Sequence, residues 1–297
     1  MELELNQEAL SAAQIQKKNH FARKQAVHAL LMHYLPLLFL PSIFFISWNS
    51  QYLVLFFATY VLAKLGTTLG YHRMLAHRSF VHSKGVKIVF SVLGSMSGQG
   101  PIYYWVATHR HHHRHSDQPQ DLHSPYRHSQ VRTWKGFWDS HMGWLTHTAM
   151  PNLFRYIPDL LRDPVCYRIH QTYLFWVLVS LTLPGFVLVW MTGDSAEFGK
   201  GVLIGGILRM CLQQQTTFLV NSLTHFYGYR NFKTADRSYN NPLVAILTLG
   251  EGWHNNHHAV QQSAKHGFKW YEIDVTYMVI WCLEKLKLIR DVKRGLA

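Results

Sequence analysis

Long apolar runs constrain the fold of this chain more than any other feature of its sequence. A helix needs about 20 predominantly apolar residues to cross the hydrocarbon core of a bilayer. Because the backbone polar groups of a spanning segment must be satisfied within that segment or in a closed barrel, such runs predict membrane-spanning helices. Four runs have about this length, at residues 30–48, 51–70, 172–192 and 201–220. We therefore expect an all-α membrane protein with about four transmembrane helices.

The four runs differ in spacing and polarity. Only Asn49 and Ser50 separate the first two runs, which predicts a tight helical hairpin. The third run has no charged residue, whereas the fourth contains Arg209 and three consecutive glutamines, Gln213–Gln215. Since polar groups within a bilayer usually face a protein interior or a cavity, we expect the fourth helix to face inward.

Two further stretches are partly apolar. Residues 86–106 are diluted by Ser, Gly and Gln, and they predict a buried or interfacial helix rather than a fifth span. The segment TYMVIWCLEKLKLI, residues 276–289, is typical of an amphipathic helix at a membrane surface.

Lysine and arginine residues indicate the direction of insertion. Four lie in residues 1–29, twelve in 72–171 and ten in 226–297, but none lies in the connections 49–50 and 193–198. The positive-inside rule then places both termini and a histidine-rich helical cap, residues 72–171 and 226–297, in the cytoplasm. This topology also explains the net charge of +13 without a nucleic-acid partner. We expect one domain over residues 1–297, in an integral multi-pass membrane protein.

The chain has 21 histidines, and many of them cluster in the cytoplasmic segments. His72 and His77 stand at the end of the second run, in GYHRMLAHRSF. Two H-x-x-H-H triplets follow, in WVATHRHHHRHSD and GEGWHNNHH. Positions i, i+3 and i+4 share a helix face, so we expect each triplet to point three imidazoles at one place. The triplets are His109, His112, His113 and His254, His257, His258.

These histidines predict a metal centre. Imidazole suits iron, zinc and copper, and so many histidines exceed the coordination of one ion, so two metals are expected. His225, four residues after Asn221 at the end of the fourth run, is a further candidate. The run from His109 to His115 could instead form a basic surface patch. Single histidines are expected at the surface or behind the ligands, namely His82, His111, His115, His123 and His128.

At these motifs, residues from about 70 to 269 resemble the membrane fatty acid desaturases of the Δ9 acyl-CoA and acyl-lipid branch. The resemblance rests on the two triplets, HRSF after the first pair, the Gly-Trp-Leu at 143–145 and NSLTHFYG at 221–228. It implies two iron ions, O2 as co-substrate and electrons from a separate ferredoxin- or cytochrome-type donor. The implied ligands are His72, His77, His109, His112, His113, His225, His254, His257 and His258, with Asn221 acting through a water.

The resemblance also implies a kinked tunnel for a long saturated acyl chain, shaped by Gln99, Trp105 and Thr217, and a cis double bond at Δ9. Ala107 and Thr108 stand where animal acyl-CoA desaturases have charged residues near the carrier, so CoA, acyl-carrier protein and lipid all stay open. A hydroxylase, an acetylenase or a terminal desaturase would share the same motifs. A histidine-rich metal transporter would need histidines within its spans, and only His33 lies in a run.

Overall fold

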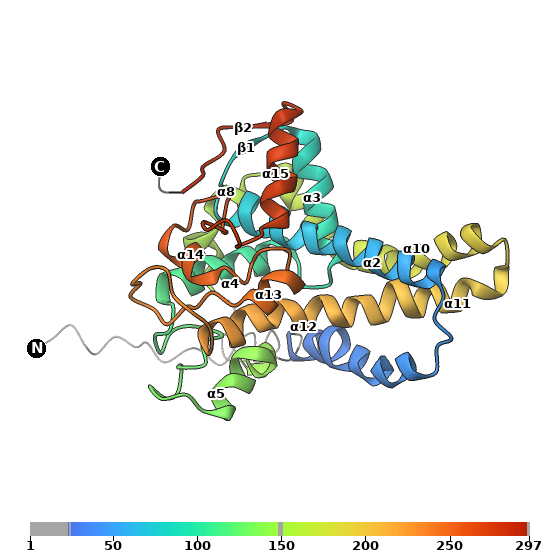
Figure 1. Cartoon of the computed structure of the whole chain (residues 1–297), viewed down its shortest axis with the longest axis horizontal. Helices are drawn as coiled ribbons and strands as arrows, with labels where there is room; N and C mark the ends of the chain where they lie inside the picture. Colours follow the sequence, from blue (N-terminus) through green and yellow to red (C-terminus); the bar gives the residue numbers. More distant parts are fainter. Residues whose placement is uncertain (1–22, 24, 148–150, 296–297) are drawn as a thin grey trace, which may run out of the picture.

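The computed structural model describes residues 23, 25–147 and 151–295, which form helices and one small sheet (Figure 1). Segments with π or 3-10 geometry carry the label η. The first half contains η1 (Leu30–Tyr34), η2 (Leu35–Phe44), α2 (Ser50–Leu65), η3 (Gly66–Ala76), β1 (Val81–His82), α3 (Lys84–Met96), α4 (Ile102–His115), α5 (Trp134–Trp138), η4 (Asp139–Gly143) and α6 (Trp144–His147). The second half contains α7 (Leu153–Tyr156), α8 (Pro158–Leu161), α9 (Pro164–Gln171), α10 (Tyr173–Thr192), η5 (Ser195–Glu197), α11 (Phe198–Gly201), η6 (Val202–Leu208), α12 (Arg209–Ser222), η7 (Leu223–His225), α13 (Pro242–Leu247), α14 (His254–Ala259), α15 (Val275–Lys285) and β2 (Ile289–Arg290).

Among the described residues, three helices are long and apolar enough to cross a membrane: Gln25–Phe44, Ser50–Ala76 and Tyr173–Thr192. They contain most of the first three apolar runs, and the second continues beyond residue 70 as the π-helical segment η3. A short connection, residues 45–49, joins the first helix to α2, but η2 packs mainly against η6 and α12, so the predicted tight hairpin does not form. Asn49 begins α2, where its side chain accepts a hydrogen bond from the backbone N–H of Tyr52 at 2.9 Å.

The fourth run forms a continuous helix through α11, η6, α12 and η7. This helix packs against α2 and α10, and Figure 1 shows the three running side by side. This helix is not among the three apolar helices above, because its polar side chains lower its mean hydropathy. Those side chains lie inside the bundle, as expected. Arg209, Gln213 and Gln214 are all buried. The guanidinium of Arg209 donates to the backbone oxygens of Gly205 and Ser180 at 3.0 Å.

Residues 86–106 do not form the single helix that their composition predicted. They divide between α3 and α4, because Gly98 and Gly100 have positive φ values of 72° and 108° and Pro101 starts the second helix. Glycine adopts this backbone region without steric cost, and proline is tolerated at a helix start. The C-terminal segment forms α15 as expected, and Asp274 caps it by accepting from the backbone of Tyr277.

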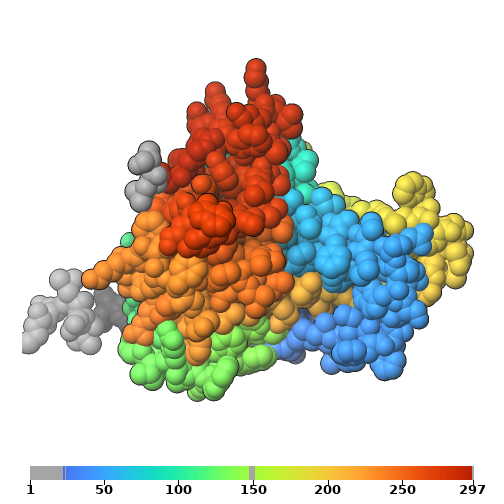
Figure 2. Space-filling model, in the orientation of Figure 1, coloured from blue at the N-terminus to red at the C-terminus, as the bar shows by residue number. Residues whose placement is uncertain are grey.

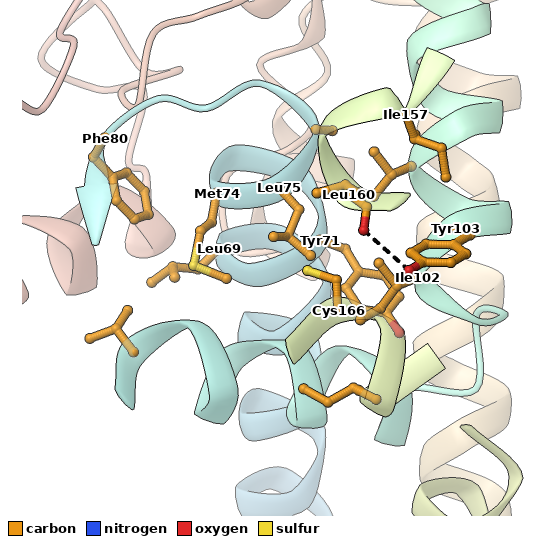
Figure 3. Close-up of a cluster of buried hydrophobic side chains, with 14 of the residues drawn as sticks. Leu69, Tyr71, Met74, Leu75, Phe80, Ile102, Tyr103, Ile157, Leu160 and Cys166 are labelled. Carbon is orange, nitrogen blue, oxygen red and sulfur yellow. Dashed lines mark hydrogen bonds between the residues drawn. The ribbon is translucent and has the colours of Figure 1, made fainter. Parts of the chain in front are cut away.

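A buried apolar cluster fixes the helices that carry the histidines (Figure 3). Leu69, Met74 and Leu75 of η3 pack in it with side chains of α4, α8 and α9. The hydroxyl of Tyr103 on α4 donates to the backbone oxygen of Leu160 at 3.1 Å. The cluster therefore sets the position of η3 relative to α4, which holds two of the histidine motifs in register.

The C-terminal residues, orange and red in Figure 2, form the bulk of one end of the molecule, and the blue and yellow helices project from it. The antiparallel pair β1–β2 joins this region to the segment after His77, with Val81 opposite Arg290. We call the broad end the histidine end, because α4, η7 and α14 bring their histidines together there.

Candidate metal centre

All nine predicted histidine ligands gather in two adjacent clusters at the histidine end. Within each cluster, one possible ligand atom from every member lies within 4.8 Å of the others. The first cluster contains His72, His77, His109, His113 and His257. The second contains His112, His225, His254 and His258.

The Nε2 atoms of the first cluster converge. His77 Nε2 lies 2.8 Å from that of His109 and 3.1 Å from that of His72. His113 Nε2 lies 3.0 Å from that of His109 and 2.9 Å from that of His257. Several imidazoles that point one nitrogen inward from different elements make a polydentate nitrogen site, the kind that suits transition metals.

Each H-x-x-H-H triplet is divided between the two clusters, which corrects the expectation that it points at one place. In α4, His109 and His113 belong to the first cluster and His112 to the second. In α14, His257 faces the first cluster, while His254 and His258 face the second. Neighbouring helical residues are about 100° apart around the axis, so a triplet spans two adjacent directions. One helix can thus serve two sites.

Carboxylates, two of them fully or nearly fully buried, hold four of the nine imidazoles through their Nδ1 atoms. The N···O distances are 2.6 Å for His72–Glu251, 2.9 Å for His112–Asp121, 2.9 Å for His225–Asp117 and 2.6 Å for His258–Asp236. A carboxylate on one ring nitrogen fixes the tautomer and ring orientation, and it makes the other nitrogen a better ligand. These pairs thus direct Nε2 toward the clusters.

The sequence alone predicted neither these carboxylates nor His266 as part of the centre. Asp117 and Asp121 follow the first triplet closely, in HSDQPQD, and this was the available signal. Glu251 is held by Arg73, whose Nη2 lies 2.9 Å from Oε1. His266 is fully buried, and its Nδ1 lies 3.4 Å from Glu251. The sequence spacing of Asp236, Glu251 and His266 gave no indication that they lie beside the clusters.

Most of these imidazoles are neutral at neutral pH. Burial, with neighbouring histidines adding to it, lowers the pKa of His109, His113, His254 and His257 well below the usual range. His225 differs, because Asp117 outweighs the effect of burial and raises its pKa. Neutral imidazole is the form that binds a metal.

The residues fit metal ions. Nε2 of His258 is buried with no hydrogen-bond partner in the described part of the chain, although its Nδ1 is held by a carboxylate. Burial without a partner is costly for a polar atom, and a cation would compensate for it. Neighbouring Nε2 atoms of the first site lie 2.8 to 3.1 Å apart, and a cation shared among them would stabilise this arrangement.

A cavity beside the clusters contains the three predicted tunnel residues. Gln99, Trp105 and Thr217 line it together with Asn221. A second cavity shares Trp105, His109, Thr217 and Asn221 with the first and reaches His72 and His254. The two cavities therefore adjoin, and the metal-facing histidines form part of their wall.

The other single histidines lie apart from the clusters or behind them. His123 is buried and stacks on His112 with ring centroids 4.5 Å apart, so it stands behind a candidate ligand. His128 is largely exposed, and the remaining three are partly exposed: His82, His111 and His115.

Apolar helices of spanning length and histidine clusters that could hold metal ions are together typical of a helical membrane protein that binds metal. Over residues 47–277, the chain matches the family described as fatty acid desaturase. It belongs to this family, and it is therefore an oxidoreductase of lipid metabolism.

Relatives cover nearly the whole chain. It is 35% identical over 306 residues to a hex-5-enoyl-[acyl-carrier protein] acetylenase of Moorena producens (strain JHB), across 99% of this chain and 95% of the relative. It is 40% identical to an sn-1 stearoyl-lipid 9-desaturase of Anabaena variabilis, across 86% and 87%. It is 38% identical to an acyl-CoA 5-desaturase of Anemone leveillei, across 90% and 78%.

Proposed function

We propose that this chain inserts a double bond into a fatty acyl chain, using O2 and two iron ions held by the nine clustered histidines. The observation that carries this proposal is the pair of histidine clusters in the wall of a cavity. The resemblance to desaturases supports iron as the metal. The five-histidine and four-histidine sets would each hold one ion, and Asn221 lines the same cavity, where it could hold a water ligand.

Desaturation needs an oxidant stronger than any side chain, because the methylenes it attacks are unactivated. When bound, the two irons supply this oxidant together with O2. Two hydrogens from the chain, with two electrons and two protons from outside, reduce O2 to two waters as the alkene forms. The electrons come from a separate ferredoxin- or cytochrome-type donor.

The protein's own groups position the reactants. Trp105 stacks on His109 with ring centroids 5.1 Å apart, so it fixes a ligand and also lines the acyl cavity. Thr217 lines both parts of the cavity, where the chain would have to bend. Wall residues this close to the clusters would hold one carbon–carbon bond beside the metal and exclude water.

We also propose four membrane spans, with the fourth formed by the helix through α12. Its burial against α2 and α10 explains how a helix with Arg209 and three glutamines could cross the membrane. The distribution of lysine and arginine supports both termini and the histidine end on the cytoplasmic side, as one domain.

The names of the relatives bear on the substrate. They specify stearoyl lipid, acyl-CoA and a hexenoyl acyl-carrier protein, so carrier and chain length differ among them. The resemblance alone favours Δ9 desaturation of a long saturated chain. Acetylenase activity is the second candidate, because the relative named an acetylenase covers almost all of this chain.

His257 offers a direct test of the metal proposal. We expect His257→Ala to abolish desaturation and to lower the iron content, because this Nε2 contacts those of both His72 and His113. Iron per chain is measured by mass spectrometry of the purified protein, beside fatty acid analysis of the host. His128→Ala serves as the control, since His128 is 59% exposed. An active His257→Ala variant with full iron would remove His257 from the ligand set.

A further inference from the structure

One end of the second cavity is lined by polar side chains where α2 continues into η3. Lys64, Thr67 and Thr68 line this end. Lys64 precedes His72 on the same continuous helix by eight residues, roughly 12 Å at the rise of an α-helix. It is only 1% exposed. A lysine this deeply buried in a membrane-spanning helix is costly, and such residues usually have a function.

Hydrogen bonds anchor the side chain of Lys64 to α12. Its Nζ contacts the backbone oxygen of Gln213 at 3.1 Å, Oγ1 of Thr216 at 2.8 Å and Oγ1 of Thr217 at 3.0 Å. The two threonine hydroxyls donate their own protons to the backbone oxygens of Leu212 and Gln213. Nζ of Lys64 thus lies within hydrogen-bond distance of three oxygens of α12, which hold its side chain between the two helices.

Further hydrogen bonds join α2 to its surroundings on both sides of Lys64. One turn earlier, the hydroxyl oxygens of Tyr60 and Thr216 lie 3.0 Å apart, and Tyr60 donates to the backbone oxygen of Leu247 at 2.5 Å. One turn later, Nε2 of Gln213 donates to Oγ1 of Thr67 at 3.2 Å. An alkyl chain could pass between α2 and α12 here only by breaking these bonds.

Breaking them is unfavourable. A buried donor left without its acceptors destabilises the protein, and a methylene offers no replacement. Lys64 and Thr216 are both buried inside the helix bundle, so this end would receive the methyl end of the chain rather than its carrier. A separate apolar cavity of about 250 Å³ shares no lining residue with this one, so it does not extend it.

We propose that Lys64 closes the acyl cavity and makes it a site for a short acyl tail. The new double bond then forms only a few carbons from the methyl end. The substrate is either a short acyl chain or the terminal segment of a longer one. This inference rests on the proposed desaturation, and it departs from the long Δ9 substrate that the resemblance alone favours.

The unaltered chain provides the first test. A desaturase-deficient host expresses it with ferredoxin and ferredoxin reductase and is fed hexanoic, decanoic or stearic acid. Gas chromatography with double-bond derivatisation locates the product. Unsaturated hexanoate or decanoate would identify a short-chain substrate, and a double bond near the methyl end of stearate would identify terminal binding. Both support the inference. A mid-chain double bond in stearate overturns it, while no product from any acid overturns the proposed function and the inference with it.

Variants of Lys64 provide the second test. Lys64→Met keeps the approximate length of the side chain without its amine, and Lys64→Ala opens the cavity. In both, we expect the ratio of stearate-derived to decanoate-derived product to rise by about tenfold or more, and the double bond to move away from the methyl end. Lys200→Met, at a residue with a 56% exposed side chain, serves as the control. Iron content reports on folding, and iron-loaded variants with unchanged position and length preference would overturn the proposal. If both variants lose iron, the proposal stands or falls on the chain length and double-bond position of the product that the unaltered chain makes.

Discussion

At the scale of single residues, a carboxylate behind an imidazole decides how that imidazole is held. Oδ2 of Asp236 lies 2.6 Å from Nδ1 of His258, while Oδ1 accepts from the hydroxyls of Thr234 and Ser238. Burial acts to raise the pKa of Asp236, but His258 outweighs it and the pKa lies well below the usual range. The carboxylate therefore stays ionised at neutral pH and directs Nε2 of His258 toward the second cluster.

Removing that charge tests its role. Asp236→Asn keeps the size of the side chain but not its charge, and we expect metal affinity to fall by about 10- to 100-fold. The measurement is the iron that remains after dialysis against increasing chelator. Asp291→Asn changes a carboxylate with a 72% exposed side chain and is the control. Equal iron retention in the two variants would show that the carboxylate does not support the centre.

Residue spacing predicted the candidate ligands but not their supporting groups. His109 and His113 are neighbours on one helix, so their proximity can be read from the sequence. Glu251 reaches His72 only because distant segments pack together, and no local pattern records that contact. The hydrogen bonds of Lys64 to α12 depend on tertiary packing in the same way, so its role could not be recognised from the apolar run that contains it.

At the scale of elements, the close contact between η3 and α3 fixes the first histidine pair. A Cβ atom placed on Gly66 would lie 2.2 Å from the backbone carbon of Leu93 and 2.3 Å from the backbone nitrogen of Gly94. Only a hydrogen fits there, so the helices approach backbone to backbone. This contact helps to hold the segment that carries His72.

Gly66→Ala should force the two helices apart. We expect it to destabilise the protein by about 1–3 kcal/mol, the usual cost of overpacking. The unfolding temperature of the detergent-purified protein measures this loss. Gly85→Ala on α3 is the matched control, because a Cβ there meets nothing within 4 Å. A Gly66→Ala protein as stable as the control would contradict the close packing of these helices.

Element types were largely predictable from the sequence, but several arrangements were not. Apolar length marked the first three long helices, and a mixed face marked α15. The break between α3 and α4 depends on two glycines with positive φ, which a stretch of moderate hydropathy conceals. The division of each histidine triplet between two clusters depends on how α4 and α14 face each other.

At the scale of the whole molecule, the two histidine clusters lie together at one end of a bundle of apolar helices. Arg73 illustrates this organisation: it is fully buried, and it pairs with Glu251 and with Asp274, the residue that caps α15. It thus joins the end of a long helix to the C-terminal segments. Lys64 lines the second cavity beside the clusters, and in the function proposed above this cavity would hold an acyl chain by its end.

The most direct test of the central claim is the fatty acid profile of a desaturase-deficient host that expresses this chain with an electron donor system. We expect new unsaturated chains with the double bond at one defined position, and we expect them to disappear in His257→Ala. The double bond should lie near the methyl end if Lys64 closes the cavity. Saturated chains alone, from iron-loaded protein with a working donor, would contradict the assignment as a desaturase.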